Sequence, residues 1–349
     1  MSIENFFSSS LNNYIFIYTP PKVGSTTLVS SLRISLGNIF NIIHIHDEIM
    51  LEVLTGIRNI KINDILSRLT EAGKNVYVID VYRTPIERKI SEFFEKISCY
   101  HFNNSEENIN NYPTIKIINR FNKLFPHLSI CDHYLEKYDI KEPIEFNFER
   151  KYTLQTVNNI NYIKLRLCDS KEWSNILSNV FQREIVIVSD YQTEDKKISE
   201  LYRRFKTEYK IPANYLQNIE NCRYLKYYYS ETEILEYLNI WKNKMCEPVV
   251  SYTKEEFKFY MEICLENQYI NDIQGEHYMD EGCICSNCSV RRQSVFKKIK
   301  NGEYTKEKII HSEVKKELLK KEIIKKEIIK KEIIKKEKET NKKMNILFM

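Results

Sequence analysis

The amino-acid sequence predicts an α/β protein with a parallel β-sheet that is covered by helices on both faces. Short apolar runs, rich in β-branched and aromatic residues, alternate with segments whose apolar residues recur at helical spacing. Each of the first three apolar runs is followed by such a helical segment. Strands that alternate with helices form βαβ units, in which neighbouring strands run parallel. A three-layer structure is therefore expected, with the sheet in the middle.

The apolar pattern also gives the approximate bounds of the elements. The expected strands cover residues 14–18, 39–45, 75–82, 162–167 and 185–188. The expected helices cover residues 26–36, 62–72 and 86–97, and glycines end the first two of them. From residue 194 to 243 the pattern is mostly helical, and Pro212 opens a new helical segment there.

Composition divides the 349-residue chain into three parts. Residues 1–245 are expected to form the α/β domain, residues 246–296 a helical extension with a cysteine cluster, and residues 297–349 a charged low-complexity tail. The net charge of +5 arises in this tail, because the rest of the chain is slightly acidic. A broad nucleic-acid-binding face is therefore not expected, although a local basic pocket is compatible with this charge distribution.

The cysteines and the hydropathy indicate a cytoplasmic protein. Nine cysteines, an odd number, are present without a disulfide framework, and no secretory signal precedes them. No run approaches the ~20 apolar residues that a transmembrane helix needs. The sequence thus predicts a soluble chain with no transmembrane segment.

The tail repeats a pentad between residues 318 and 337, which reads LLKKE once and then IIKKE three times. Each repeat advances ~140° around a helix, so the isoleucine pairs are spread over all faces and form no single apolar stripe. Glutamate and lysine four residues apart support a helix. A solvated, partly helical tail is the expected structure. The alternative is a basic helix that contacts an anionic membrane surface or a partner.

The turn after the first strand reads PPKVGSTTL and has features of an anion site. Gly24 allows a close approach of the backbone, and Ser25, Thr26 and Thr27 lie where a helix begins. The N–H groups and the positive dipole end of a helix start suit a phosphate. The alternative is an ordinary helix start that Ser or Thr caps. Lys22 precedes the only glycine, so the turn is not a Walker A motif, and a conventional ATPase or GTPase is disfavoured.

A second group of polar residues follows the third strand, in the segment YRTPIERKISEFF. Arg83 lies at the strand end, Pro85 redirects the chain, and Ser91 falls within the next helix. An arginine fork and a hydroxyl can converge on one oxyanion there. The alternative is that Arg83 pairs with a local carboxylate such as Glu87 and that Ser91 faces solvent. Two anion sites at the carboxyl ends of neighbouring parallel strands fit the usual location of ligands in such sheets.

These motifs resemble the sulfotransferases that use 3′-phosphoadenosine 5′-phosphosulfate. The sequence is similar above all to a branch described as putative capsular polysaccharide synthesis proteins. The resemblance covers roughly residues 14–242, where KVGSTT, HIHD, RTPIERKISEFF, IKLRL and LYRRFKTEYKIPANYL follow in the same order. It implies a P-loop NTPase-like sulfotransferase fold and the phosphosulfate nucleotide as co-substrate.

The resemblance also implies roles for the residues of the two motifs. Lys22 would contact the bridging oxygen of the sulfonate donor and stabilise the charge that develops there. The residues expected to hold the 5′-phosphate are Gly24, Ser25, Thr26 and Thr27. The 3′-phosphate would be bound by Arg83 and Ser91.

The acceptor hydroxyl needs a general base within hydrogen-bond reach. His44 and His46 are the candidates, because they lie at the end of the second strand and alternation places them on the same side. Asp47 is a possible orienting carboxylate or an alternative base. A structural hydrogen-bonding role for either histidine is the competing interpretation.

The sequence departs from the family pattern at two places. Thr84 stands where the family often has Asp, and Cys168-Asp169 stands where an acidic pair often follows the LRL strand. Arg83 and Ser91 are retained, so these departures concern the acceptor side more than the nucleotide side.

A separate cluster of potential metal ligands lies in the extension. His277, Cys283, Cys285 and Cys288 are suitable ligands for a tetrahedral zinc ion. The C-x-C-x-x-C spacing lacks the paired C-x-x-C knuckles of a zinc ribbon, so unligated thiols and another redox or metal role are alternatives.

Together these observations lead to one expected function and two alternatives. The expected function is transfer of a sulfonate group from 3′-phosphoadenosine 5′-phosphosulfate to a hydroxyl acceptor, with a carbohydrate as the expected acceptor class. The first alternative is a nucleotide-dependent kinase or a protein of polysaccharide assembly. The second is a nucleotide-binding protein that has no transferase activity.

Overall fold

A computed structural model describes residues 9–101, 105–188 and 197–265. Nearly all of them belong to one compact unit that ends at Lys258. The zinc candidates and the repeat tail lie outside the described residues. The description below concerns the compact unit.

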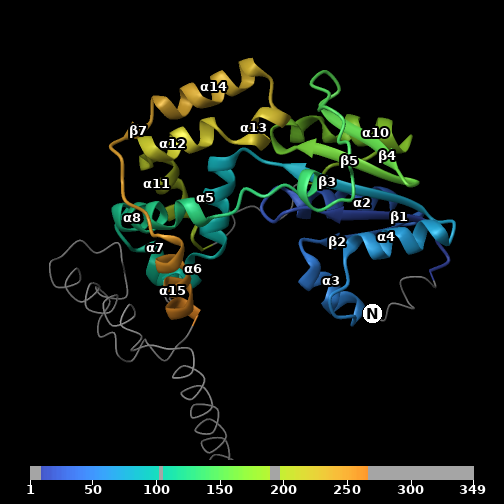
Figure 1. The fold of residues 1–349 in the computed structure, drawn as a ribbon, viewed down its shortest axis with the longest axis horizontal. Coiled ribbons are helices and arrows are strands. Elements are labelled where there is room, and N and C mark those ends of the chain that lie inside the picture. The colour runs from blue at the N-terminus through green and yellow to red at the C-terminus, as the bar shows by residue number, and fades with distance from the viewer. Residues whose placement is uncertain (1–8, 102–104, 189–196, 266–349) are drawn as a thin grey trace, which may run out of the picture. The chain divides into compact units, whose positions relative to one another are not determined.

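The centre of the unit is a five-stranded sheet with the strand order β2-β1-β3-β5-β4 (Figure 1). Strands β1 (Asn13–Tyr18), β2 (Phe40–Ile45), β3 (Asn75–Tyr82) and β5 (Ile160–Arg166) run parallel, which confirms four predicted strands. Strand β4 (Tyr152–Val157) is antiparallel to β5, so the sheet is mostly rather than wholly parallel. Asn158 and Asn159 join the two strands in a tight turn, and both have positive φ.

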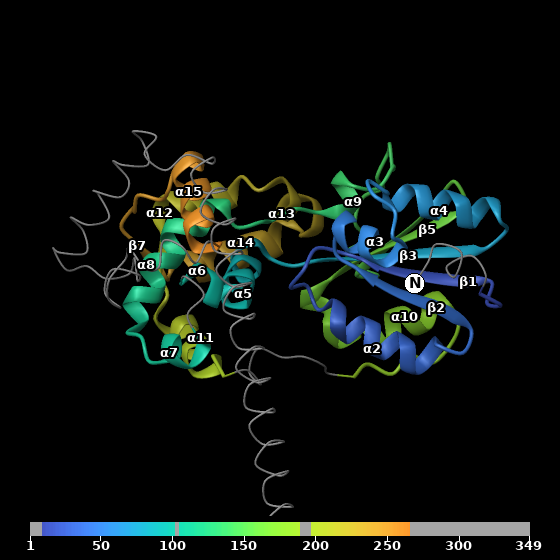
Figure 2. The ribbon, with the colours of Figure 1, turned by 90° about the horizontal axis from the view of Figure 1, so that it is seen from below.

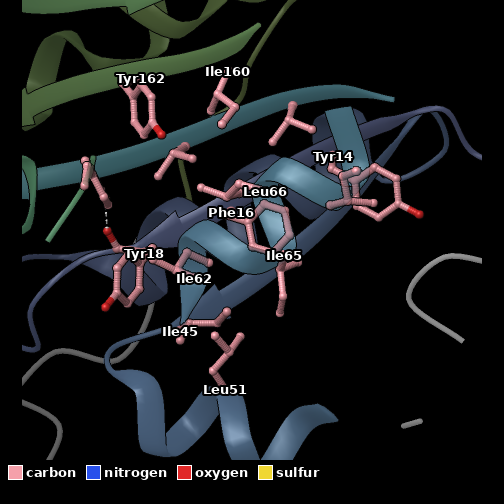
Figure 3. Close-up of a cluster of buried hydrophobic side chains, with 14 of the residues drawn as sticks. Tyr14, Phe16, Tyr18, Ile45, Leu51, Ile62, Ile65, Leu66, Ile160 and Tyr162 are labelled. Carbon is pink, nitrogen blue, oxygen red and sulfur yellow. Dashed lines mark hydrogen bonds between the residues drawn. The ribbon is translucent and has the colours of Figure 1, made fainter. Parts of the chain in front are cut away.

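Helices cover both faces of the sheet, as predicted (Figure 2). Helices α2 (Ser25–Leu36) and α10 (Trp173–Phe181) pack on one face, where alternate residues of the strands meet them. Helices α3 (Glu48–Thr55), α4 (Ile62–Glu71) and α9 (His133–Glu136) pack on the other face. Figure 3 shows this second core, in which Phe16 of β1 lies among Ile62, Ile65 and Leu66 of α4.

The prediction of a strand at residues 185–188 is wrong. This segment has no strand pairing. Its N–H groups bond to serine hydroxyls instead: that of Ile185 bonds to Ser178 of α10, and those of Val186 and Val188 bond to α2. Val186 N–H donates to Ser35 Oγ at 3.0 Å, and Val188 N–H donates to Ser31 Oγ at 2.9 Å. Ile185 is fully buried against the α2 face, which explains the strand-like apolar run.

The rest of the unit is helical. Its elements are α5 (Pro85–Glu95), α6 (Ile97–Tyr100), α7 (Glu106–Asn110), α8 (Thr114–Leu124), the short η1 (Phe125–His127) and η2 (Leu167–Glu172), α11 (Ser199–Glu208), α12 (Ala213–Glu220), α13 (Arg223–Tyr228) and α14 (Glu231–Lys242). Helix α15 (Lys254–Leu265) begins before the end of the unit at Lys258 and extends beyond it. Strands β6 (Ile211–Pro212) and β7 (Met245–Cys246) form a short parallel pair. Pro212 precedes α12, as predicted. Among the described residues, no helix combines the length and the apolar character needed to cross a membrane.

Candidate functional site

The two predicted anion loops lie at the carboxyl ends of adjacent parallel strands. The turn at residues 19–24 follows β1, and the segment that begins at Arg83 follows β3. The chain leaves β1 for β2 on one side and returns to β3 on the other side. In doubly wound sheets, such a reversal of strand order creates a crevice at the carboxyl ends of the two strands, and ligands bind in this crevice.

The turn after β1 has an unusual backbone. Lys22 has a φ of 67° and Gly24 a φ of 87°, so both residues are in the left-handed region. Gly24 is the N-cap of α2 and has no side chain to cap it. Ser25, Thr26 and Thr27 are therefore the first three residues of the helix and do not act as its N-cap. The first turn of α2 has no side-chain cap hydrogen bond, and its N-terminal N–H groups are those that suit an anion.

Gly24 is also required by the packing of the turn. A Cβ atom at this position would lie 2.9 Å from Leu167 Cδ1 and 3.1 Å from the Trp173 ring. Any larger residue would thus push the turn away from the segment that follows β5. The sequence suggested that Gly24 allows a ligand to approach the backbone closely. In the structure, the side chains of Leu167 and Trp173 make that close approach. The positive φ of Gly24 is a second reason for glycine at this position.

Arg83 joins the two loops directly. Its Nη1 donates to the carbonyl oxygen of Lys22 at 2.9 Å. The predicted alternative partner, Glu87, is held by α14, where it accepts from Tyr237 OH at 2.9 Å and from Trp241 Nε1 at 3.1 Å. In the described part of the chain, the hydrogen bond of the Arg83 side chain goes to the turn after β1.

Helix α5 faces the same turn. Lys22 Nζ lies 3.0 Å from Glu95 Oε2, and the two side chains are 16% and 35% exposed. Ser91 is one helical turn before Glu95 and therefore on the same side of α5. Its residue is 5% exposed, so it does not face solvent as the alternative interpretation required.

The two candidate histidines lie together beside the turn. The rings of His44 and His46 are 4.5 Å apart at an interplanar angle of 77°. Burial, together with the smaller effects of the neighbouring His46 and Arg33, lowers the pKa of His44 from 6.5 to about 4. His44 is therefore neutral near pH 7, and its buried Nε2 has no hydrogen-bond partner among the described residues.

His46 has the geometry of a general base. Its Nδ1 lies 2.8 Å from the carbonyl oxygen of Thr19. Because a carbonyl only accepts, Nδ1 must carry the proton in this hydrogen bond, and the lone pair of the neutral ring is then on Nε2. Asp47 plays a different part, since its Oδ1 accepts the Met50 N–H at 2.8 Å and caps α3. The carbonyl of Thr19, rather than Asp47, orients the His46 ring.

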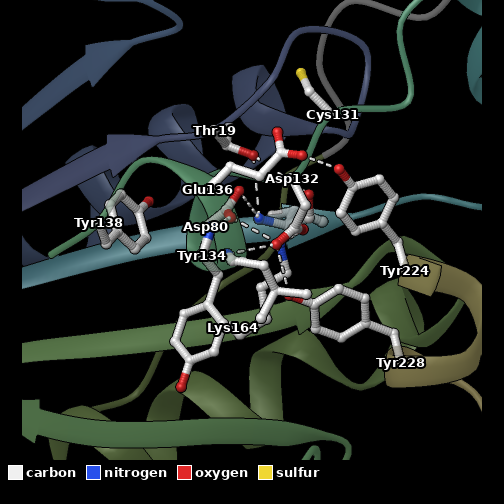
Figure 4. A network of polar contacts seen from close by, with 12 residues as sticks. Thr19, Asp80, Cys131, Asp132, Tyr134, Glu136, Tyr138, Lys164, Tyr224 and Tyr228 are labelled. Carbon is white, nitrogen blue, oxygen red and sulfur yellow. Dashed lines mark hydrogen bonds and ion pairs between the residues drawn. The ribbon is translucent and has the colours of Figure 1, made fainter. Parts of the chain in front are cut away.

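A buried charged network lies next to this end of the sheet (Figure 4). Lys164 of β5 is fully buried and forms ion pairs with Asp80 of β3, at 2.7 Å, and with Asp132. Tyr228 OH donates to Asp132 Oδ1 at 2.7 Å, and Tyr134 N–H donates to Asp80 Oδ2 at 2.9 Å. The network therefore links β3 and β5 to α9 and α13.

Sequence reasoning missed Glu95, Thr19 and this network. The sequence does contain a signal for the network, because Asp80 and Lys164 each interrupt an apolar strand. No comparable local signal marks Glu95.

In the described ranges, no group of three or more His, Cys, Asp or Glu side chains is arranged to hold a metal ion. The predicted zinc ligands, His277, Cys283, Cys285 and Cys288, lie beyond those ranges.

Comparison of the chain with protein-family models, with curated proteins and with solved structures found no match. The chemistry of the site must therefore be inferred from its own residues. These supply a helix N-terminus, two cationic side chains and a histidine whose Nδ1 is held by a backbone carbonyl, all at one edge of the sheet.

Proposed function

We propose that the protein transfers a sulfonate group from 3′-phosphoadenosine 5′-phosphosulfate to a hydroxyl acceptor, with a carbohydrate as the expected acceptor class. The observation that carries this proposal is the hydrogen bond from Arg83 to the Lys22 carbonyl, 2.9 Å long. It couples the two loops, so that a ligand with two separate anionic groups is the natural occupant. A nucleotide with phosphates on both its 3′ and 5′ oxygens has this form.

The proposed binding roles are those that the resemblance to sulfotransferases implies for each residue. The start of α2, from Gly24 to Thr27, would hold the 5′-phosphate through its N–H groups and hydroxyls. Arg83 and Ser91 would hold the 3′-phosphate, since the remaining guanidinium nitrogens can still form a fork. Lys22 would lie near the oxygen that bridges phosphorus and sulfur.

In the proposed reaction, the acceptor oxygen forms a bond to sulfur while the bond from sulfur to the phosphate oxygen breaks. The hydroxyl proton passes to His46 Nε2, and the bisphosphate leaves with the electron pair of the broken bond. Lys22 stabilises the charge that develops on the leaving oxygen. To do so, its amine must move from the carboxylate of Glu95 to the donor.

The proposal is tested by calorimetric titration of the full chain with 3′-phosphoadenosine 5′-phosphate, ATP and AMP. The bisphosphate is expected to bind at least about tenfold more tightly than AMP, because an extra charged hydrogen bond contributes ~1.5–3 kcal/mol. Arg83→Ala should remove this preference. Arg203→Ala, which changes an exposed arginine of α11, is the matched control and should leave it intact.

Three outcomes would contradict the proposal. If the bisphosphate binds no more tightly than AMP, the two-phosphate site does not exist. If ATP binds more tightly than the bisphosphate, a kinase-like function is favoured instead. A bisphosphate preference combined with no sulfonate transfer to any hydroxyl acceptor would leave a nucleotide-binding protein.

A further inference from the structure

We infer that Thr19 is a positioning residue that holds the base and the two anion loops in one arrangement. The inference rests on the proposed function for what these groups do once aligned. Thr19 directly follows β1 and has no solvent exposure. Each of its three polar groups bonds to a different part of the site.

The main-chain N–H of Thr19 continues the pairing of β1 with β2. It donates to the carbonyl oxygen of Ile45 at 3.3 Å. This bond fixes the end of β2 one residue before His46. The separation between the β1 turn and the segment that carries the base is thereby set by the backbone.

The Thr19 hydroxyl replaces a missing strand bond between β1 and β3. The pairing of these strands ends at Ile17 and Ile79. If the same register continued for two more residues, Thr19 would pair with Val81. Instead, Thr19 Oγ1 accepts the Val81 N–H at 3.1 Å and lies 3.4 Å from the Val81 carbonyl oxygen. The Val81 N–H is shared with Asp80 Oδ1 at 2.7 Å, but Asp80 is on the same strand. Only the threonine hydroxyl connects the two strands at this level of the described structure.

The position of this bond is what gives it a function. Val81 is two residues before Arg83, and Thr19 is three residues before Lys22. At a switch point neighbouring strands must separate so that a ligand can enter. The hydroxyl limits that separation, and thus keeps Arg83 within reach of the Lys22 carbonyl.

The Thr19 carbonyl completes the arrangement by orienting His46. The contact of 2.8 Å to Nδ1 selects the tautomer with its lone pair on Nε2. When Nε2 takes up a proton, the ring becomes a cation and its bond to this carbonyl becomes charge-assisted and stronger. A backbone carbonyl thus fills the orienting role that a carboxylate has in many catalytic sites.

The first experiment uses the wild-type protein and reads the His46 tautomer from imidazole 15N chemical shifts at neutral pH. A protonated Nδ1 and an unprotonated Nε2 are expected. The reverse tautomer would overturn the inference, because the Thr19 carbonyl could then not orient the ring. This measurement does not depend on any variant being able to fold.

The second experiment compares Thr19→Val with Thr19→Ser. Valine keeps the shape and the carbonyl but lacks the hydroxyl, so the bisphosphate preference over AMP should fall about tenfold, as expected for one hydrogen bond. Serine should retain the preference, and both variants should keep the His46 tautomer. Thr153→Val changes another buried threonine, on β4, and is the matched control.

The results separate the inference from the proposed function. A wild-type protein without a bisphosphate preference overturns the proposed function. A wild-type preference that Thr19→Val leaves unchanged overturns the role of the Thr19 hydroxyl alone. Loss of the preference in both Thr19→Val and Thr153→Val would show a general loss of stability and would also overturn that role.

Discussion

Arg83 and Lys22, which are 61 residues apart in the sequence, are joined by a hydrogen bond of 2.9 Å from a guanidinium to a main-chain carbonyl. The bond is made to the backbone at a residue whose φ is 67°, a conformation that costs free energy for any residue other than glycine. Arg83 therefore helps to maintain the shape of the turn as well as offering a charge. A ligand that binds Arg83 would act on the position of Lys22.

The ion pair between Lys22 and Glu95 leads to a prediction about affinity. The Glu95 carboxylate holds the Lys22 amine at 3.0 Å. An anionic ligand must compete with it, so Glu95→Gln should tighten bisphosphate binding. The pair is partly exposed and is worth at most about 1 kcal/mol, which corresponds to a gain of up to about fivefold.

Calorimetric titration of wild type and Glu95→Gln at low and high salt tests this prediction. The difference should shrink as salt screens the pair. Glu107→Gln, which disrupts the exposed pair with Lys197, is the control and should not change affinity. Weaker binding in Glu95→Gln would contradict the prediction and would indicate that Glu95 positions Lys22 for the ligand.

Replacement of Lys22 separates a role in the transition state from a role in ground-state binding. If Lys22 stabilises the leaving oxygen, Lys22→Ala should lower kcat by about 100-fold or more and weaken binding of the bisphosphate product much less. Steady-state kinetics and product titration are the measurements. Lys171→Ala, at an exposed position of η2, is the control. Equal losses in kcat and in product affinity would contradict the assigned role.

The central part of the fold could be predicted from the sequence because its signals are local. Apolar runs and helical spacing identified β1, β2, β3 and β5 and the helices α2, α4 and α5, but not α3 or the helices between α5 and β4. Strand β4 was missed because its apolar alternation is weak and Leu154 is 41% exposed. The sequence signal for a hairpin was the pair Asn158-Asn159 before β5, since asparagine tolerates the positive φ that both residues have in this turn.

The incorrect prediction of a strand at residues 185–188 also has a physical explanation. Burial of Ile185 gives an apolar run, but periodicity cannot show where the backbone N–H groups bond. Here the N–H groups of Val186 and Val188 bond to Ser35 and Ser31, more than 150 residues away.

The site was predictable only in part. Lys22, Gly24 and Arg83 could be placed together because parallel strands bring their carboxyl ends to one edge. The contacts from Glu95 to Lys22 and from Thr19 to Val81 span 73 and 62 residues, respectively. Such contacts depend on the angle of α5 and on the separation of two strands, which no local pattern encodes.

The buried network around Lys164 leads to a prediction about stability. Lys164→Ala would leave the carboxylates of Asp80 and Asp132 buried without their cation, at a cost of ~3–5 kcal/mol of unfolding free energy. Asp132→Asn keeps the pair between Lys164 and Asp80, so its cost should be smaller, ~1–3 kcal/mol. Urea unfolding followed by circular dichroism measures both. An equal cost in the two variants would show that Asp132 is as important as the lysine.

The last prediction concerns His133, whose ring lies 4.5 Å from that of Tyr18, the residue before Thr19. Burial, together with the smaller effects of the nearby cations of Lys137 and Lys164, lowers the pKa of His133 from 6.5 to about 3. Between these two values the unfolded chain binds a proton that the folded protein excludes. The stabilising contribution of the neutral ring is therefore complete above pH 6.5 and is lost as the pH falls toward 3.

His133→Phe keeps an aromatic ring against Tyr18 and removes this titration. The unfolding free energy of wild type should fall by about 2–3 kcal/mol more than that of His133→Phe between about pH 7 and pH 4.5. Urea unfolding at several pH values within this interval gives the two slopes, and the carboxylates contribute equally to both. Parallel slopes would mean that His133 can accept a proton in the folded state, which would place water or an acceptor beside its Nδ1.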